Sequence, residues 1–298
     1  MNKGFLFVCL ILFQGFFNSC IHGSVKKGAA VGPRSFLCDD FKALNDMFWW
    51  YDWGANLNMI RKYSNCSNIE QYINNFIPMI WGRGSFLNVS IPSNAAYILG
   101  FNEPNHFEQS NITAEQAAKY WPYIEELSQG RLLVSPAAAP CGGKCHGNAT
   151  EWFDKFFKYC LGCRIDYLAT HYYSCNADKT MAYLRDLYNR YGKKIWLSEF
   201  ACPGTASPDK ELNYMKQILP MLEAAPFVFR YSWFASRVKE GVFVTSAASL
   251  LEPKSSALTE LGQFYNSFIT KKSMNTSVSW LITILEGFVG FWEYLLGL

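Results

Sequence analysis

The sequence has little net charge and few charged residues of any kind. Its 298 residues include 27 lysines and arginines against 24 aspartates and glutamates, which leaves a formal charge of +3. This balance excludes a nucleic-acid-binding protein that depends on a basic surface. No block of five like charges forms a charged tail. Half of the residues are hydrophobic, so the chain is also too apolar to be disordered.

The sequence also lacks a proline- or serine-rich linker, so residues 24–270 are predicted to form one domain. Aromatic residues, in contrast, are abundant, with 10 Trp, 17 Tyr and 24 Phe. This number exceeds what a core needs. In a weakly charged protein it favours flat apolar ligands, and sugars are one such class.

An apolar run near the N-terminus is shorter than the about 20 residues of a membrane span. It extends from Gly4 to Phe17 and follows Lys3. This pattern predicts a signal peptide over residues 1–23 and therefore a secreted, extracellular protein. A permanent anchor and a buried N-terminal helix are less favoured interpretations.

A second apolar segment, residues 271–298, follows the predicted domain. Glu286 and Glu293 interrupt it and lie seven residues apart, on one face of a helix. An amphipathic helix, packed or lying on a membrane, is the favoured interpretation. A cleaved lipid-anchor signal and a single span stay open, as does cell-surface attachment through residues 278–298.

The cysteine count agrees with export. Eight cysteines lie outside the predicted signal peptide, and an even number in an exported chain indicates disulfides. A bridge between Cys175 and Cys202 would stiffen two loops. The spacings Cys141-x3-Cys145 and Cys160-x2-Cys163 resemble a zinc site, but oxidation in an exported protein disfavours it. The sequence therefore predicts no metal and no cofactor. Five sequons predict a glycoprotein, at Asn65, Asn88, Asn111, Asn148 and Asn275.

Eight short apolar runs alternate with helical patterns. The runs read as strands buried on both faces and cover 26–31, 47–53, 76–81, 96–101, 131–136, 165–172, 194–200 and 227–234. Helices are predicted at 114–127, 152–159, 177–191 and 209–222, the first capped by Thr113 with Gln116 three residues on. Such alternation predicts an α/β fold with a single (β/α)8 TIM-type barrel.

Two glutamates end predicted strands. Glu103 follows an apolar strand and precedes Pro104, and Glu199 ends the seventh run. In a barrel both would lie at the C-terminal face. Burial at the end of an apolar strand is expected to raise the pKa of a carboxyl group to suit a general acid, while a second carboxylate nearby can stay ionised as a nucleophile. Glycoside hydrolysis requires such a pair.

Four motifs carry a resemblance to a known family. They are Gly100-Phe101-Asn102-Glu103-Pro104, Phe76-Ile77-Pro78-Met79-Ile80-Trp81-Gly82, Trp196-Leu197-Ser198-Glu199-Phe200-Ala201-Cys202 and Arg230-Tyr231-Ser232-Trp233-Phe234. Along the chain these motifs occur in the family's order, and over residues 26–266 the chain resembles glycoside hydrolase family 128, the Asl1-like catalytic domain, whose members cleave β-1,3-glucans.

The resemblance implies a retaining β-1,3-glucanase of the endo type, although the sequence leaves endo and exo action open, because that depends on how loops close the cleft ends. Glu199 would be the nucleophile, Glu103 the acid/base, and Asn102 would hold the sugar 2-hydroxyl. Tyr172 or Tyr173 would orient Glu199, and Trp233 would form the floor under the reacting sugar. The platforms for neighbouring sugars would be drawn from Trp50, Trp53 and Trp81.

The other side chains near strand ends carry weaker expectations. Trp50 or Trp53 is expected to contact sugar and Trp49 to pack against helices. His171 either binds substrate or is structural, and Arg230 is expected in a buried ion pair or an orienting role. Asp52 either binds a sugar hydroxyl or caps a loop. Core positions are expected for Trp121, Trp152 and Trp196.

Two other functions stay open. Another retaining β-glycosidase on the same barrel would keep both glutamates. A non-catalytic β-glucan-binding surface protein would keep the tryptophans without needing the carboxylates. The expected partner in every case is a β-1,3-glucan or another β-glycan, bound by a monomer.

Overall fold

The computed structural model describes residues 23–86, 89–141, 143–239 and 243–268. The predicted signal peptide, apart from residue 23, and the tail from residue 269 lie outside these ranges, as do Asn88 and Asn275. Among the described residues, no helix has the length and hydrophobicity needed to cross a bilayer.

The chain forms an α/β fold in which parallel strands alternate with helices. The strands are β1 (Lys27–Ala30), β2 (Trp49–Tyr51), β3 (Tyr97–Leu99), β4 (Leu132–Val134), β5 (Leu168–His171), β6 (Ile195–Phe200) and β7 (Val228–Trp233). The α-helices are α2 (Asp40–Ala43), α3 (Asn58–Ser64), α4 (Ala114–Ser128), α5 (Ala149–Tyr159), α6 (Ala177–Tyr191), α7 (Pro208–Ala224) and α8 (Glu260–Ser267). Three 3-10 helices complete the list: η1 (Ile69–Asn75), η2 (Arg83–Phe86) and η3 (Ser246–Ala248).

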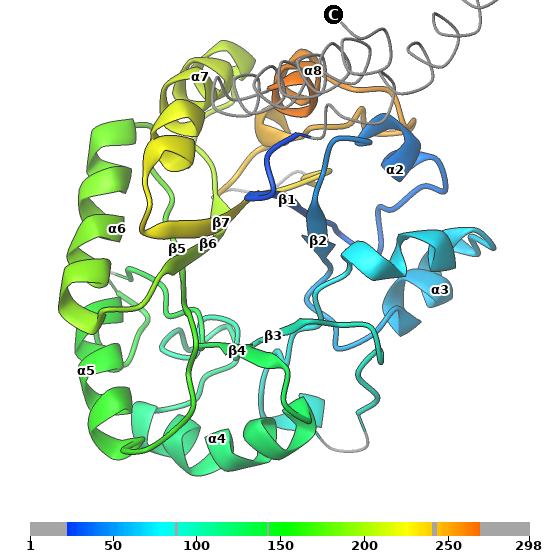
Figure 1. The fold of residues 1–298 in the computed structure, drawn as a ribbon. Helices are drawn as coiled ribbons and strands as arrows, with labels where there is room; N and C mark the ends of the chain where they lie inside the picture. Colours follow the sequence, from blue (N-terminus) through cyan, green and yellow to red (C-terminus); the bar gives the residue numbers. More distant parts are fainter. Residues whose placement is uncertain (1–22, 87–88, 142, 240–242, 269–298) are drawn as a thin grey trace, which may run out of the picture.

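The strands form two parallel sheets, one with the order β2-β1-β7-β6-β5 and one with the order β3-β4. Isolated parallel bridges join them: Val134 pairs with Tyr167 just before β5, and Met79 pairs with Leu99. Figure 1 shows the strands surrounding a common centre with the long helices outside them.

One predicted strand, residues 76–81, forms isolated bridges instead of a ladder. Phe76 pairs with Trp50 on one side and Met79 with Leu99 on the other. Pro78 lies between them and has no N–H to donate, which interrupts regular pairing. The segment still occupies the position between β2 and β3 that the prediction gave it.

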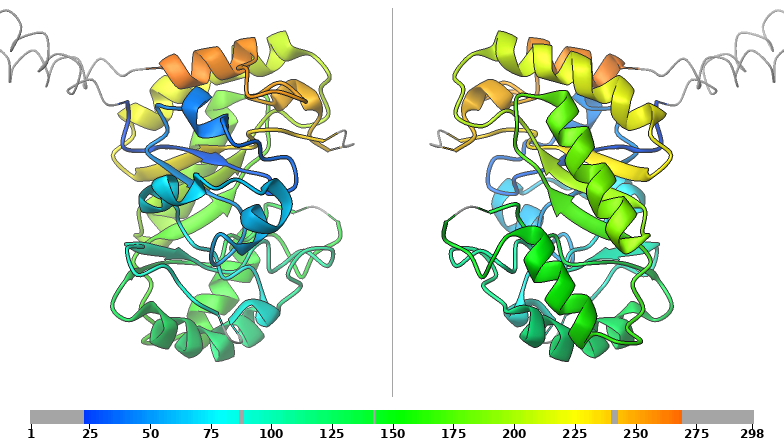
Figure 2. Two further views of the ribbon diagram at one scale, coloured as in Figure 1. Left: turned by 90° about the vertical axis from the view of Figure 1, so that its right-hand side faces the viewer. Right: turned by 90° about the vertical axis from the view of Figure 1, so that its left-hand side faces the viewer.

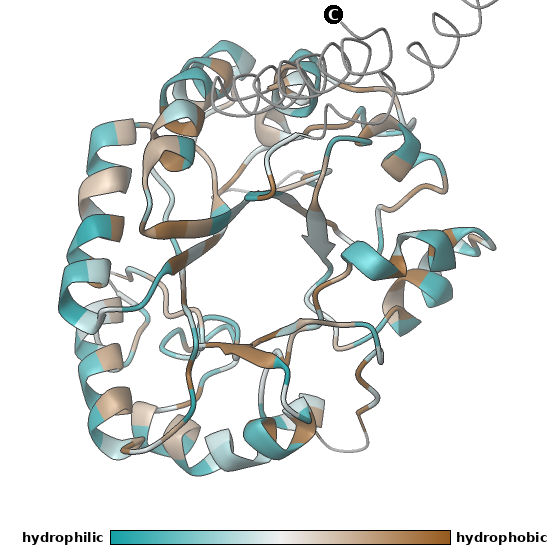
Figure 3. Cartoon of the chain, in the orientation of Figure 1, coloured by the Kyte–Doolittle hydropathy of each residue, from teal (hydrophilic) through white to brown (hydrophobic). Residues whose placement is uncertain are grey.

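The helices follow their local signals closely. At the start of α4, the Thr113 hydroxyl accepts from the Gln116 N–H while the Gln116 side chain accepts from the Thr113 N–H, which confirms the predicted capping box. Figure 3 shows hydrophilic and hydrophobic residues alternating along α5 and α6. On α5 the buried face includes Trp152, Phe153 and Phe156.

Aromatic rings pack the two sheets together. The Trp196 ring on β6 lies 5.0 Å from Trp49 on β2 and 5.2 Å from Tyr97 on β3, centroid to centroid. A larger apolar cluster fills the space between strands and helices and contains Trp121 and Trp152. The three tryptophans predicted as core, the third being Trp196, are at most 1% exposed. Figure 2 shows the outer helices from both sides.

Candidate active site

Glu103 reaches the site through an unusual local backbone. A Cβ on Gly100 would lie 2.7 Å from the Pro136 nitrogen, so only glycine allows this close approach to the segment after β4. The chain then bridges Asn102 to Ala137 and turns at Glu103, whose φ is 39°. Non-glycine residues rarely adopt this left-handed conformation, which often marks functional sites.

His171 at the end of β5 brings the two predicted catalytic carboxylates together. Its Nδ1 lies 2.8 Å from Glu103 Oε1 and 3.4 Å from Glu199 Oε2. One ligand-type atom from each of the three side chains lies within 4.8 Å of the others. His171 is completely buried, and Glu199 is only 5% exposed. The prediction that the strands ending in Glu103 and Glu199 converge is therefore confirmed.

Two further donors bond to the Glu199 carboxylate, and the Tyr51 hydroxyl, which donates to the Ser198 carbonyl at 2.9 Å, lies beside it. Trp53 Nε1 donates to Oε1 at 2.8 Å, the Tyr173 hydroxyl donates to Oε2 at 2.5 Å, and the Tyr51 hydroxyl lies 3.4 Å from Oε1. Tyr173 is thus the tyrosine that orients Glu199. Tyr172 stacks on Tyr183 of α6 instead, with ring centroids 4.5 Å apart.

The electrostatics of the free site differ from the sequence-based expectation. Burial raises the pKa of Glu103, but the hydrogen bond and charge of His171 outweigh burial and lower it. Burial raises the pKa of Glu199, and it remains raised although His171, Tyr173 and Trp53 oppose this. Burial lowers the pKa of His171, but the two glutamates outweigh it and raise it. The raised pKa expected for the general acid is therefore not found at Glu103 in the free site, because the sequence did not place His171 against it.

Two of the expected sugar-binding tryptophans face away from the site. Trp50 is 1% exposed and donates from Nε1 to the Tyr72 carbonyl, packed against Phe41 and Phe76. Trp233 is completely buried and donates to the Ala248 carbonyl. Neither contacts the carboxylates, so of Trp50 and Trp53 it is Trp53 that reaches the site, and the buried position of Trp233 does not fit a floor under the reacting sugar.

The physical reason is the alternation of side chains along a strand. Trp49 and Tyr51 point from β2 toward the Trp196 side, with Trp50 between them on the opposite face. Trp49 therefore packs among the strands and not against helices, which corrects a further expectation. The same alternation places Tyr51 on the side of the strand that faces Glu199, a position that was not assigned to it from the sequence.

Aromatic rings line the approach to Glu199. The Phe234 ring lies 5.8 Å from Trp53 and 5.7 Å from Tyr173, both edge-on, and the exposed Phe243 lies 4.9 Å from Tyr173. Neither Phe234 nor Phe243 was assigned a role in the site from the sequence. Phe234 ends a predicted strand, but like Phe243 it lacks the polar group that marked the other candidates. Trp81 is half-buried and belongs to the same apolar cluster as Trp53.

Asn102 presents an unpaired acceptor beside Glu103. Its Nδ2 donates to Gln109 Oε1 at 3.3 Å, and its buried Oδ1 has no hydrogen-bond partner within the described ranges. A buried acceptor without a partner is costly unless a ligand supplies a donor. A sugar hydroxyl is such a donor.

Asp52 caps a loop through one carboxylate oxygen, in agreement with one of its two interpretations, while its buried Oδ2 has no hydrogen-bond partner among the described residues. Its Oδ1 accepts from the Gly54 N–H at 2.9 Å, and burial raises its pKa to about 7. Because this pKa is above that of an unfolded aspartate, about 3.9, the native state loses stability as pH rises from about 4 to 7.

Asp52→Asn is therefore expected to stabilise the protein more at pH 8 than at pH 5, by about 2–3 kcal/mol. The asparagine keeps an acceptor for Gly54 and never ionises. Urea unfolding of both proteins at both pH values measures this. An equal gap between variant and wild type at the two pH values would contradict it.

The cysteines are paired within the described chain. The disulfides are Cys38–Cys66, Cys141–Cys145, Cys160–Cys163 and Cys175–Cys202. Cys175–Cys202 confirms the predicted bridge between the loops after β5 and β6, beside Tyr173 and Glu199.

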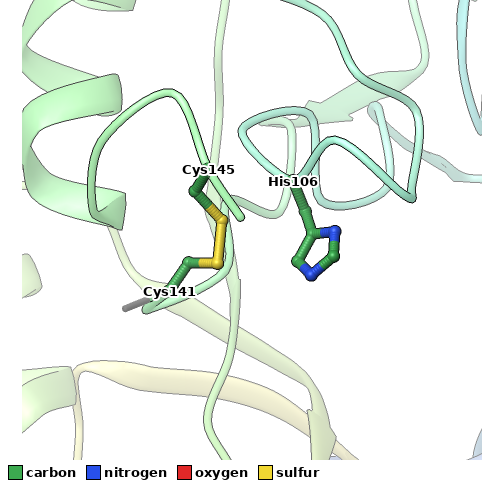
Figure 4. A group of neighbouring side chains, drawn as sticks. All are labelled: His106, Cys141 and Cys145. Carbon is green, nitrogen blue, oxygen red and sulfur yellow. A yellow bond between two sulfur atoms is a disulfide. The ribbon is translucent and has the colours of Figure 1, made fainter. Parts of the chain in front are cut away.

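The structure groups His106 with Cys141 and Cys145 closely enough to suggest metal ligands. Figure 4 shows, however, that the two sulfurs are bonded to each other, which removes the thiolates that a zinc ion needs. The second cluster of potential ligands is Glu103, His171 and Glu199. In this cluster the Nδ1 atom of His171 already pairs with both carboxylates.

Comparisons with known proteins bear on the whole described core. A family model described as glycosyl hydrolase catalytic core matches residues 28–265. Alkali-sensitive linkage protein 1 of Schizosaccharomyces pombe is 32% identical over 257 residues, which cover 82% of this chain and 45% of that protein. The chain thus spans less than half the length of this curated relative.

Solved structures of glycoside hydrolase family 128 are also similar. The subgroup II endo-β-1,3-glucanase from Sorangium cellulosum gives a TM-score of 0.72 at 32% identity, covering 81% of this chain and 98% of that chain. The subgroup II endo-β-1,3-glucanase from Pseudomonas viridiflava gives a TM-score of 0.68 at 31% identity, covering 82% of this chain and 98% of that chain. A variant of the subgroup I endo-β-1,3-glucanase from Amycolatopsis mediterranei, in complex with laminaripentaose, gives a TM-score of 0.66 at 25% identity. The match covers 82% of this chain and 99% of that chain.

Proposed function

The chain belongs to the glycosyl hydrolase catalytic core family, as a glycoside hydrolase of family 128, and from this premise we propose that it hydrolyses β-1,3-glucosidic bonds in glucans by a retaining mechanism. The observation that carries the proposal is the pair of buried glutamates bridged by His171, with carboxylate oxygens within 4.8 Å. Retaining enzymes hold their carboxyl groups about 5–5.5 Å apart, whereas inverting enzymes need about 6.5–9.5 Å.

In the first step Glu199 attacks the anomeric carbon and the leaving oxygen takes a proton from Glu103. Tyr173 and Trp53 hold the attacking carboxylate in one orientation, and their hydrogen bonds favour its ionised form. His171 Nδ1 lies 2.8 Å from Glu103 Oε1, so the two groups share one proton, which Glu103 passes to the leaving oxygen.

In the second step water attacks the covalent glycosyl-enzyme. Glu103, now ionised, removes the proton from that water, and Glu199 leaves with its carboxylate restored. Asn102 Oδ1 accepts from the sugar 2-hydroxyl during both steps. The rings of Trp53, Trp81 and Phe234 form platforms for neighbouring sugars.

The proposal includes a closed (β/α)8 barrel. Its support is the series of isolated bridges that join β2 to residues 76–81, these residues to β3, and β4 to the segment before β5. The carboxylates then lie at the C-terminal ends of strands, where barrel enzymes place their chemistry. Residues 24–270 are the proposed catalytic domain.

We also propose that the protein is exported. Four disulfides support this, because such bonds persist in oxidising compartments. The proposed glucan partner, the monomeric state and any membrane attachment through residues 278–298 are parts of the same proposal.

The direct test is product analysis of a linear β-1,3-glucan, laminarin, digested by the full-length protein. Mixed-linkage glucan, β-mannan and cellulose serve as parallel substrates. Laminari-oligosaccharides of several lengths are expected from laminarin, with the β-anomer formed first. Release of glucose alone would contradict endo action, and no cleavage by folded protein would move the function to glucan binding.

Trp53→Phe and Trp50→Phe form a matched pair that separates the site from the core. Trp53→Phe removes a donor to Glu199 and is expected to lower kcat on laminarin by about 10²-fold. Trp50→Phe removes a buried indole and its hydrogen bond, so it should destabilise the fold by about 2–3 kcal/mol and leave kcat nearly unchanged. Laminarin kinetics and urea unfolding of both variants measure this, and a large loss of kcat in Trp50→Phe would contradict the assignment.

A further inference from the structure

A cavity lies at the end of the strands opposite the carboxylates. Its volume is about 110 Å³, well above the about 10–15 Å³ that one water requires on this measure. Phe48 and Trp49 line it where β2 begins, and Ala96 and Tyr97 where β3 begins. Glu103 and Glu199 lie at or beyond the other ends of β3 and β6, so this cavity is separate from the proposed active site.

Arg230 of β7 forms the buried part of this cavity. The residue is 7% exposed, and its Nη1 has no hydrogen-bond partner in the described part of the chain. No described carboxylate lies within salt-bridge distance, so the buried ion pair expected from the sequence is absent.

Aromatic rings surround the Arg230 guanidinium instead. Its Cζ lies 4.6 Å from the Tyr97 ring centroid and 4.8 Å from that of Trp196, with Trp49, Phe48 and Phe229 between 5.4 and 5.8 Å. Such cation–π contacts offset part of the desolvation of the charge. They provide no hydrogen-bond acceptor for Nη1, and burial lowers the pKa of Arg230 to about 10.

The rim of the cavity is polar and open to solvent. Asn74, Asn75 and Asn94 line it and are exposed. Asn94 Nδ2 donates to Asn74 Oδ1 at 2.7 Å, and Asn75 Nδ2 donates to the Phe48 carbonyl at 2.9 Å. A ligand entering past these amides would meet the guanidinium at the buried end.

We propose that this cavity binds a small oxyanion, a carboxylate or phosphate group, through the guanidinium of Arg230. A buried charge without a counter-charge is costly, and an entering anion removes that cost. The planar guanidinium matches the geometry of carboxylate and phosphate oxygens.

The test measures thermal unfolding of the full-length protein in sodium chloride, sodium acetate and sodium phosphate at equal ionic strength and pH. Acetate or phosphate is expected to raise the melting midpoint by about 3–5 °C over chloride. Comparing the acetate and phosphate samples shows whether the cavity prefers a carboxylate or a phosphate group. Tryptophan fluorescence should change saturably with the same anion, because Trp196 and Trp49 contact the guanidinium.

Two variants assign the effect to this cavity. Arg230→Met keeps much of the aliphatic stem without the charge and is expected to lose the anion-dependent shift. Asn74→Asp keeps the acceptor for Asn94 and adds a fixed carboxylate, so it should melt higher than wild type in chloride and respond less to added anion. Laminarin hydrolysis should stay within about two-fold in both, since the site is at the other end of the strands.

Two results would overturn the proposal. One is a wild-type protein with no anion-dependent shift or fluorescence change at constant ionic strength. The other is an undiminished shift in Arg230→Met, which would place the anion elsewhere. If Arg230→Met fails to fold, an undiminished shift in Asn74→Asp has the same meaning. These readouts are independent of glucan hydrolysis.

Discussion

Glu199→Gln is expected to lower kcat on laminarin by at least about 10⁴-fold, equivalent to about 5.5 kcal/mol of barrier. The amide retains the size of the side chain and one acceptor for Trp53 or Tyr173, but it cannot displace the leaving group from the anomeric carbon. Steady-state hydrolysis of laminarin measures kcat, and circular dichroism shows that the variant is folded.

Glu211→Gln is the matched control. Glu211 is also a buried carboxyl near the end of β6, where it accepts from the Cys202 N–H at 3.1 Å, and burial raises its pKa to about 7. It touches neither Glu103 nor His171 in the described structure, so its variant should keep kcat within about two-fold of wild type. Equal losses in both variants would show that the effect comes from folding and not from chemistry.

The geometry also predicts how the lost step is restored. Glu199→Ala leaves space on the face from which the nucleophile attacks. Azide added with an activated aryl β-glucoside should fill that space and yield an α-glycosyl azide. With Glu103→Ala, azide should instead replace water in the second step and yield a β-glycosyl azide. Assignment of the products by NMR tests both roles, and the same anomer from both variants would contradict them.

Asp40→Ala is expected to destabilise the fold by about 3–5 kcal/mol, the usual cost of breaking a buried ion pair. Asp40 Oδ2 and Oδ1 accept from the two Nη atoms of Arg237 at 2.5 and 2.6 Å. The two side chains are at most 4% exposed. Arg237 also donates to the carbonyls of Ser35 and Glu252 and so joins two distant segments. In the variant its guanidinium stays buried there without its counter-charge.

The neighbouring Asp39→Ala provides the control. Asp39 pairs with Lys42 at 2.7 Å, but both side chains are more than 60% exposed. Exposed pairs of this kind contribute little, so the free energy of unfolding should scarcely change. Urea unfolding of the two variants is the measurement. Similar losses would mean that burial does not strengthen the Asp40–Arg237 pair.

The linear sequence was sufficient to place the elements that carry the site. Seven of the eight predicted strands are present, because both faces of each strand are buried and leave a continuous apolar run. The capping box at Thr113 was also predictable, since caps depend on neighbours three residues apart, and the bridge between Cys175 and Cys202 was a candidate because both follow neighbouring strands, although the even number of cysteines does not fix their pairing. Glu103 and Glu199 were recognisable because each polar residue ends an apolar run.

Contacts between distant strands could not be predicted in the same way. The pKa of Glu103 depends on His171, which is 68 residues away and approaches only when β3 and β5 are placed in one fold. Tyr51 reaches Glu199 across 148 residues. No local pattern records such distances, so the direction of the pKa shift could not be predicted from the sequence.

The sequence by itself determined which residues are catalytic candidates, because a carboxylate at the end of a buried strand has a local signature. Only the tertiary structure decided which ring of Trp49, Trp50 and Trp53 meets the site, since a slip of one residue in register moves every side chain to the opposite face. It also decided that Arg230 has aromatic neighbours and no carboxylate, because the partners of a buried charge are set by packing between strands far apart in the chain.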